Sequence, residues 1–127
     1  MEMRPTENIS EVYANMYKAV SKVHEAGLTL AIGTDTMGGV FPFGGSSYEL
    51  QLYVEKVGLT PMEALKIGTL NGYKVMGLDS DLGTIEKGKL ADFIAVSEDP
   101  LDDIKCLKEK DNIKLALVNG EPVKNLL

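Results

Sequence analysis

The stretch LTLAIGTDTMGG, residues 28–39, places an acid at the end of an apolar run. Because side chains alternate along a strand, the bulky residues Leu28, Leu30 and Ile32 would share one face. The opposite face would carry small side chains and end in Asp35. This pattern predicts a buried strand of the kind found in parallel sheets, with a carboxylate at its carboxyl end.

Helical patterns on both sides of this run end in glycine followed by leucine, at Gly27, Gly58 and Gly77. Apolar residues recur with helical spacing before each glycine. A left-handed glycine followed by an apolar residue is typical of a Schellman cap at a helix C-terminus. The sequence therefore predicts three helices, over residues 8–26, 46–57 and 60–76.

Each predicted helix begins with a polar residue that has a glutamate three positions later, a pair that can form a reciprocal capping box. The pairs are Asn8 with Glu11, Ser46 with Glu49, and Thr60 with Glu63. In the third helix Ala64, Gly68 and Gly72 lie four residues apart, so one stripe has almost no side chain. Because internal glycines weaken a helix, the stripe predicts close approach by another backbone.

After Leu78 the pattern changes to short strands and turns. The predicted elements are a strand at 84–85, a turn at 87–88 and a strand at 93–96. Asn119-Gly120, between apolar residues, is typical of a two-residue hairpin turn. Pro122 should keep the returning strand short and at a sheet edge.

Composition limits the classes of function. The chain has 127 residues, 44% hydrophobic and 25% charged, which suits one globular domain. A net charge of -6 provides no basic surface for nucleic acid. No apolar run reaches the ~20 residues that span a bilayer, and the start lacks a signal-peptide pattern, so we expect no membrane partner. A single cysteine fits a reducing compartment, and we expect a cytoplasmic protein.

Asp35 has two interpretations. At the carboxyl end of a strand in an α/β fold it would lie where ligands bind. It could equally cap the following turn, since Gly38 and Gly39 fit a tightly bent loop. The local sequence favours neither interpretation.

The other polar candidates favour structural roles. His24, the single histidine, suits the surface at the end of the first helix. Cys106 suits a small core position, because the sequence around it does not mark a low-pKa thiolate. A cluster of acidic residues near position 100 favours a solvated loop over a calcium site, because its spacing lacks the pattern of a calcium-binding loop. Its members are Glu98, Asp99, Asp102 and Asp103.

Several separated motifs, in order, resemble the C-terminal third of the metal-dependent amidohydrolase superfamily. They are AIGTD, ELQLYVEKVGLTPMEALKIGTLNGYKVMGL, LGTIEKGKLADFIAVSEDPLDDI and VNGEPVK. The resemblance covers nearly the whole chain and is nearest to the imidazolonepropionase-like and Xaa-Pro dipeptidase-like branch. The family usually has alanine where Gly68 stands. Some dipeptidase-like members have a histidine soon after the aspartate, which this chain lacks.

The resemblance implies an α/β fold, the last strand and flanking helices of a (β/α)8 barrel plus strands of a composite β-sandwich. Residues 1–78 would belong to the barrel and residues 79–127 to the sandwich. Asp35 would bind a divalent catalytic metal, most simply zinc, and handle the proton of the attacking water. The substrate would be bordered by Thr36, Met37, Gly38 and Gly39.

The resemblance also implies that much of the active site lies outside this chain. The family's other metal ligands, an HxH pair, a lysine or glutamate, and further histidines, would precede residue 1. A catalytic zinc takes three protein ligands, and a barrel takes about 250 residues. We therefore expect the isolated chain to be inactive and to hold no metal alone. The covering partner would be a missing N-terminal barrel portion or a second copy, and we expect a homo-oligomer.

Two functions remain at this stage. The chain is either the C-terminal portion of an enzyme that hydrolyses amide or cyclic amide C–N bonds with a metal-bound hydroxide, or a non-catalytic folding and assembly module. A module would pair with itself or with a separate N-terminal half. A third possibility is that only residues 79–127 fold, as a small β unit.

Overall fold

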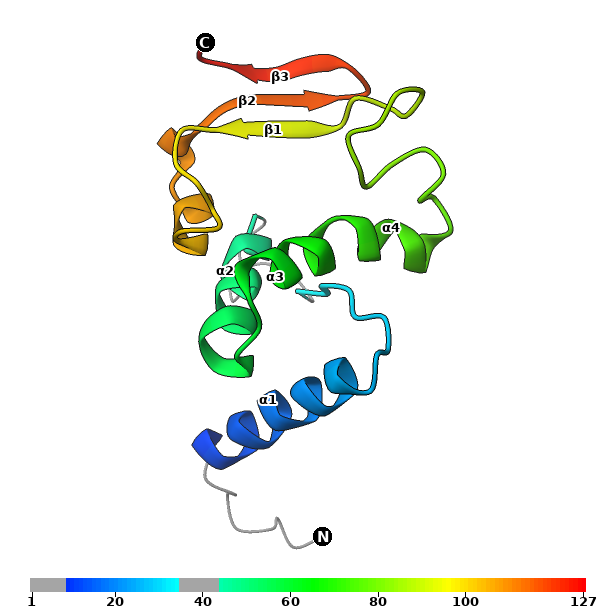
Figure 1. Cartoon of the computed structure of the whole chain (residues 1–127). Helices are drawn as coiled ribbons and strands as arrows, with labels where there is room; N and C mark the ends of the chain where they lie inside the picture. The colour runs from blue at the N-terminus through cyan, green and yellow to red at the C-terminus, as the bar shows by residue number, and fades with distance from the viewer. Residues whose placement is uncertain (1–8, 35–43) are drawn as a thin grey trace, which may run out of the picture.

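Helices occupy the first part of the chain and a small sheet the last (Figure 1). The structure, a computed structural model, describes residues 9–34 and 44–127. The helices are α1 (Ile9–Glu25), α2 (Ser46–Leu52), the π-helical η1 (Tyr53–Val57), α3 (Pro61–Gly68) and α4 (Leu70–Met76). The strands are β1 (Phe93–Val96), β2 (Ile113–Val118) and β3 (Glu121–Asn125), and two 3₁₀ turns, η2 (Ile104–Lys108) and η3 (Lys110–Asn112), precede β2. In Figure 1, α1 lies on one side of α2 to α4 and the sheet on the other.

The predicted helix endings are confirmed. Gly27, Gly58 and Gly77 all have positive φ, between 70° and 88°. The amides of Gly27 and Leu28 donate to the carbonyls of His24 and Val23, which is the Schellman pairing. The same pattern closes α4, whereas Leu59 donates to Tyr53 because the preceding turn is π-helical.

One of the predicted capping boxes is confirmed and another is wrong. Thr60 accepts a hydrogen bond from the Glu63 amide, and the Glu63 side chain returns one to the Thr60 amide. Helix α2 begins after Gly45 with no side-chain cap, so Ser46 and Glu49 form no box. Glu49 instead contacts Gly33 and Tyr53, because a tertiary hydrogen bond competes with the local one. Asn8 lies outside the described residues.

The third predicted helix is interrupted. Its stripe of small residues contacts side chains more than another backbone. Thr69 leaves helical geometry, with φ -125° and ψ -94°, and separates α3 from α4. Ala64 is fully buried. A Cβ atom at Gly68 would lie 2.8 Å from Leu50 Cδ2, and one at Gly72 would meet nothing within 4 Å. The expected backbone approach is therefore wrong at these positions.

The buried strand predicted over residues 28–34 forms no ladder among the described residues. They follow α1 without a ladder partner. Their predicted faces are retained only in part. Ile32 packs against the core and Leu30 lies beside Ile67, but Leu28 is exposed, as are Thr29 and Gly33. A strand needs a neighbouring backbone to hydrogen-bond, and the described residues supply none.

The sheet confirms the predictions for the end of the chain. Its order is β1-β2-β3, with both pairs antiparallel. Asn119 and Gly120 have φ of 53° and 79°, as a type I′ hairpin requires. Pro122 lies in β3, an edge strand. The mixed α/β character is thus confirmed, with three antiparallel strands in the described part.

The predicted strand at 84–85 is wrong, whereas the turn at 87–88 is confirmed. The segment before the turn packs on α4 instead of pairing in the sheet. Gly83 has φ +92°, and a Cβ atom there would lie 3.1 Å from both Leu70 Cα and Tyr73 Cδ2. The close backbone approach that was predicted for the stripe of small residues occurs instead between Gly83 and the Leu70 backbone.

We expect Gly83→Ala to destabilise the chain more than Gly88→Ala. Both glycines have left-handed φ, which costs a non-glycine residue about 1–2 kcal/mol. At Gly83 a new Cβ would also lie 3.1 Å from the Leu70 backbone, whereas at Gly88 a new Cβ would meet nothing within 4 Å. Urea unfolding followed by circular dichroism measures both variants. Equal losses would show that the approach to α4 contributes nothing.

The motif GTIEKGKLAD has a structural role, which is carried by Gly83, Lys89, Ala91 and Asp92. Lys89 Nζ donates to the Asp79 carbonyl at 2.7 Å. The Asp92 carboxylate accepts the Asn119 amide, and Gly120 donates to the Ala91 carbonyl. The motif therefore joins α4 to the hairpin turn, which explains its residue types without a ligand.

A small core joins the two parts of the chain. Leu50, Ala64 and Ile104 form a buried cluster, with Ile32 packed against it. Lys105 pairs with Glu55 at 2.8 Å, and Lys108 Nζ donates to Gln51 and lies over the Tyr48 ring. These contacts hold η2 against α2. The division into residues 1–78 and 79–127 stays a prediction.

Candidate functional site

The candidate site is the carboxyl end of the extended segment 28–34, where the chain approaches Asp35. Helix α2 reaches this point through Glu49. The Glu49 Oε1 atom accepts the Gly33 amide at 3.3 Å and the Tyr53 hydroxyl at 3.2 Å. Glu49 thereby joins the extended segment to the first turns of the following helix.

The surroundings of Glu49 are partly withdrawn from water. Its second oxygen, Oε2, is buried and has no hydrogen-bond partner among residues 9–34 and 44–127. Burial, followed by the negative charge of Glu49, raises the pKa of Tyr53 to about 12. The Tyr53 hydroxyl therefore stays protonated and available as a donor at neutral pH.

A cavity of about 460 Å³ opens beside the same point. Its lining comes from the end of the extended segment, from α2 and from η2. The lining residues are Gly33, Thr34, Gly45, Tyr48, Glu49, Leu52 and Lys108. The cavity is mainly apolar, with the carboxylate of Glu49 and the ammonium of Lys108 as its charged groups.

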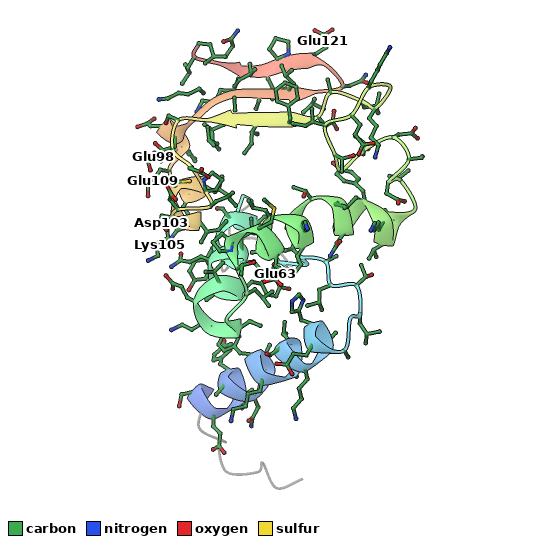
Figure 2. All side chains as sticks on the ribbon, in the orientation of Figure 1. Glu63, Glu98, Asp103, Lys105, Glu109 and Glu121 are labelled. Atoms are coloured by element: carbon green, nitrogen blue, oxygen red, sulfur yellow. The ribbon has the colours of Figure 1, made fainter. Side chains whose placement is uncertain are left out.

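Near the opposite end of the segment, a hydrogen bond joins α1 and α3. His24 Nε2 lies 3.2 Å from Glu63 Oε1, and Glu63 lies on the side of α3 that faces α1 (Figure 2). The Thr60 side chain and amide, followed by His24, lower the pKa of Glu63 to about 2. His24 is therefore only partly exposed and connects α1 to α3, a structural role near the surface at the end of the first helix.

The other sequence candidates have structural surroundings. Cys106 is buried, and burial raises the pKa of its thiol, which confirms the core interpretation. Asp99 Oδ1 accepts the Leu101 amide, and Asp103 Oδ1 accepts the Lys105 amide at the start of η2. These carboxylates therefore stabilise turns, as the solvated-loop interpretation predicts.

The residues that the structure describes do not by themselves fit a zinc ion. No group of three His, Cys, Asp or Glu side chains among them could hold a metal. His24, the single histidine, is paired with Glu63. A zinc site would need donors from beyond these residues.

The predicted site residues all lie outside the described part of the chain. They are Asp35, Thr36, Met37, Gly38 and Gly39. Glu49 and Tyr53 are the residues that sequence reasoning missed. Their spacing of four along a helix is a signal for a mutual contact, but nothing in the sequence signals the bond from Glu49 to Gly33.

No helix in the described residues is long and apolar enough to cross a bilayer.

Comparisons with known proteins place these features in a family. The profile of the amidohydrolase family matches residues 7–123. An ochratoxinase from Aspergillus niger is 43% identical over 93 residues, covering 72% of this chain and 18% of the relative. An imidazolonepropionase from Christiangramia forsetii is 37% identical over 84 residues, covering 66% of this chain and 20% of that protein. A solved structure of a Xaa-Pro dipeptidase with bound methionine is 33% identical, with a TM-score of 0.75 over 86% of this chain.

The chain spans only part of these relatives, between 18% and 25% of their length. The resemblance drawn from the ordered motifs is confirmed, including its imidazolonepropionase-like and dipeptidase-like character. Members of this superfamily are typically metal-dependent. With a family match that extends over most of its residues, the chain belongs to the amidohydrolase family.

Proposed function

We propose that this chain is the C-terminal portion of a metal-dependent amidohydrolase that hydrolyses amide or cyclic amide C–N bonds. The observation that supports the proposal is the state of residues 28–34. They belong to no helix or ladder, Ile32 packs against the core cluster of Leu50, Ala64 and Ile104, and no strand partner lies among the described residues. A barrel strand separated from its neighbours would have this character, because helices cover only its outer face and its edges pair with other strands.

In this proposal Asp35 supplies one carboxylate to the metal and acts as the general base. Active sites of such barrels lie at the carboxyl ends of the strands, which is the end that Asp35 follows. Thr36, Met37, Gly38 and Gly39 would border the substrate. The remaining donors to the divalent metal, for which zinc is the simplest choice, would come from an N-terminal barrel portion outside this chain.

A graft tests the proposal. The aligned segment of the A. niger ochratoxinase is replaced by the matching residues of this chain, and hydrolysis by the graft is compared with that of the unmodified relative. We expect the graft to hydrolyse the relative's substrate and to lose this activity with a chelator. We expect the isolated chain, supplied with zinc, to show no turnover. A folded graft without activity, or turnover and stoichiometric tight zinc in the isolated chain, would contradict the proposal.

A second function, a non-catalytic assembly module, is favoured by the apolar surface. Large apolar side chains are exposed on several elements, including Val75 on α4, Ile85 in the following loop and Ile94 on β1. Such surface is typical of a chain that pairs with itself or with a separate N-terminal half. A folded but inactive graft, together with a homo-oligomer of the isolated chain by size exclusion with light scattering, would favour the module.

A further inference from the structure

The contact from Glu49 to the extended segment has a consequence for catalysis. Gly33, whose amide Glu49 accepts, is two residues before Asp35. Two residues of extended chain span at most about 7 Å. Gly33 and Asp35 are therefore near neighbours along the chain.

The Glu49 carboxylate is itself held in place. The Tyr53 hydroxyl donates to the same Oε1 atom, and both residues lie on one continuous helical stretch, four positions apart. The Oε2 atom is buried, so the carboxylate is not a freely rotating surface group. The bond from the Gly33 amide is exposed, whereas the bond from the Tyr53 hydroxyl, which fixes the acceptor, is partly buried and therefore stronger.

Helix capping does not explain the hydrogen bonds of the Glu49 side chain. It makes no capping box, and its partners come from the extended segment and from η1. The nearby carboxylate Glu55 has a different task, because it pairs with Lys105 and fixes η2. Glu55 therefore offers a matched control on the same helical stretch.

We propose that Glu49 is a positioning residue that holds the carboxyl end of the 28–34 segment through the Gly33 amide, and so sets the position of Asp35. The inference rests on the proposed function, in which Asp35 is the metal ligand and base. Tyr53 supports it by fixing the carboxylate. Glu49 itself need not touch the substrate.

The first test uses the full chain labelled with ¹⁵N and follows hydrogen exchange of the Gly33 amide by NMR. We expect Glu49→Leu to raise the exchange rate about tenfold, the factor for losing one hydrogen bond of ordinary net strength. Glu49→Gln keeps a carbonyl acceptor and should restore most of the protection. Tyr53→Phe should have a smaller effect, and Glu55→Leu should leave Gly33 unchanged.

The second test places the same substitutions in the active graft. Misplacing a catalytic group by about 1 Å costs on the order of a hundredfold in rate. We expect Glu49→Leu to lower kcat by roughly tenfold to a hundredfold with little change in KM, Glu49→Gln to recover most of kcat, and Glu55→Leu to leave both parameters unchanged.

The outcomes separate this inference from the function on which it rests. An inactive but folded graft contradicts the proposed function, and the positioning role falls with it. An active graft in which Glu49→Leu leaves Gly33 exchange or kcat unchanged contradicts the positioning role alone. If Glu49→Gln restores both the protection of the Gly33 amide and kcat, the result supports the positioning role.

Discussion

Replacing Asp35 with asparagine should lower kcat/KM of the grafted enzyme by roughly a hundredfold to ten-thousandfold, the range for a general acid or base. Asparagine keeps the size of the side chain but cannot take a proton or bind a metal as an anion. The loss should appear mainly in kcat, since substrate contacts by neighbouring residues are retained. Steady-state hydrolysis and metal content measured on the same samples test both roles of the carboxylate.

Asp102→Asn is the matched control for this prediction. Asp102 is an exposed acid in the loop before η2, and its substitution makes the same change in charge. It should leave kcat/KM and metal content unchanged. If Asp35→Asn behaves like Asp102→Asn, Asp35 caps its turn and the proposed role is wrong.

Truncating Leu50 to alanine should lower the free energy of unfolding by about 2–5 kcal/mol, the range for large apolar residues in a core. Leu50 is only 8% exposed and contacts Ala64 and Ile104 in the cluster that joins α2, α3 and η2. Its loss would leave a cavity between these elements. Leu101→Ala, at a position 44% exposed, should cost much less. Urea unfolding of the three proteins provides the comparison.

The same site explains why glycine stands at position 68, where the family usually has alanine. An alanine Cβ there would lie 2.8 Å from Leu50 Cδ2. Gly68→Ala alone should therefore cost about 1 kcal/mol, because crowding outweighs the gain in helix propensity. In the Leu50→Ala background the same change should be neutral or stabilising. Additive effects in this cycle would contradict the contact.

Sequence motifs predicted the structure reliably where the interacting residues are close together in the chain. The glycine endings at Gly27, Gly58 and Gly77, the Thr60 box and the Asn119-Gly120 hairpin are all confirmed. Each depends on backbone conformation within a few residues. The steric freedom of glycine and the reach of a short polar side chain are enough to predict them.

Signals that need a distant partner were less reliable. Ser46 and Glu49 have the spacing of a capping box, but Glu49 is taken by Gly33, sixteen positions earlier. The stripe at Ala64, Gly68 and Gly72 predicted a backbone neighbour, and Gly83 has that contact instead. Spacing shows which residues share a face, but it does not show what that face will meet.

The sequence by itself determined the family, the glycine helix endings and the hairpin, and it predicts Asp35 as a metal ligand and general base. These follow from local conformational preferences and from the order of motifs along the chain. Only the tertiary structure decided that Glu49 reaches Gly33, that His24 pairs with Glu63 and that residues 28–34 pair with no strand among residues 9–34 and 44–127. The physical reason is that hydrogen bonds between distant segments depend on which backbones and side chains are brought together, and local propensity does not encode that choice.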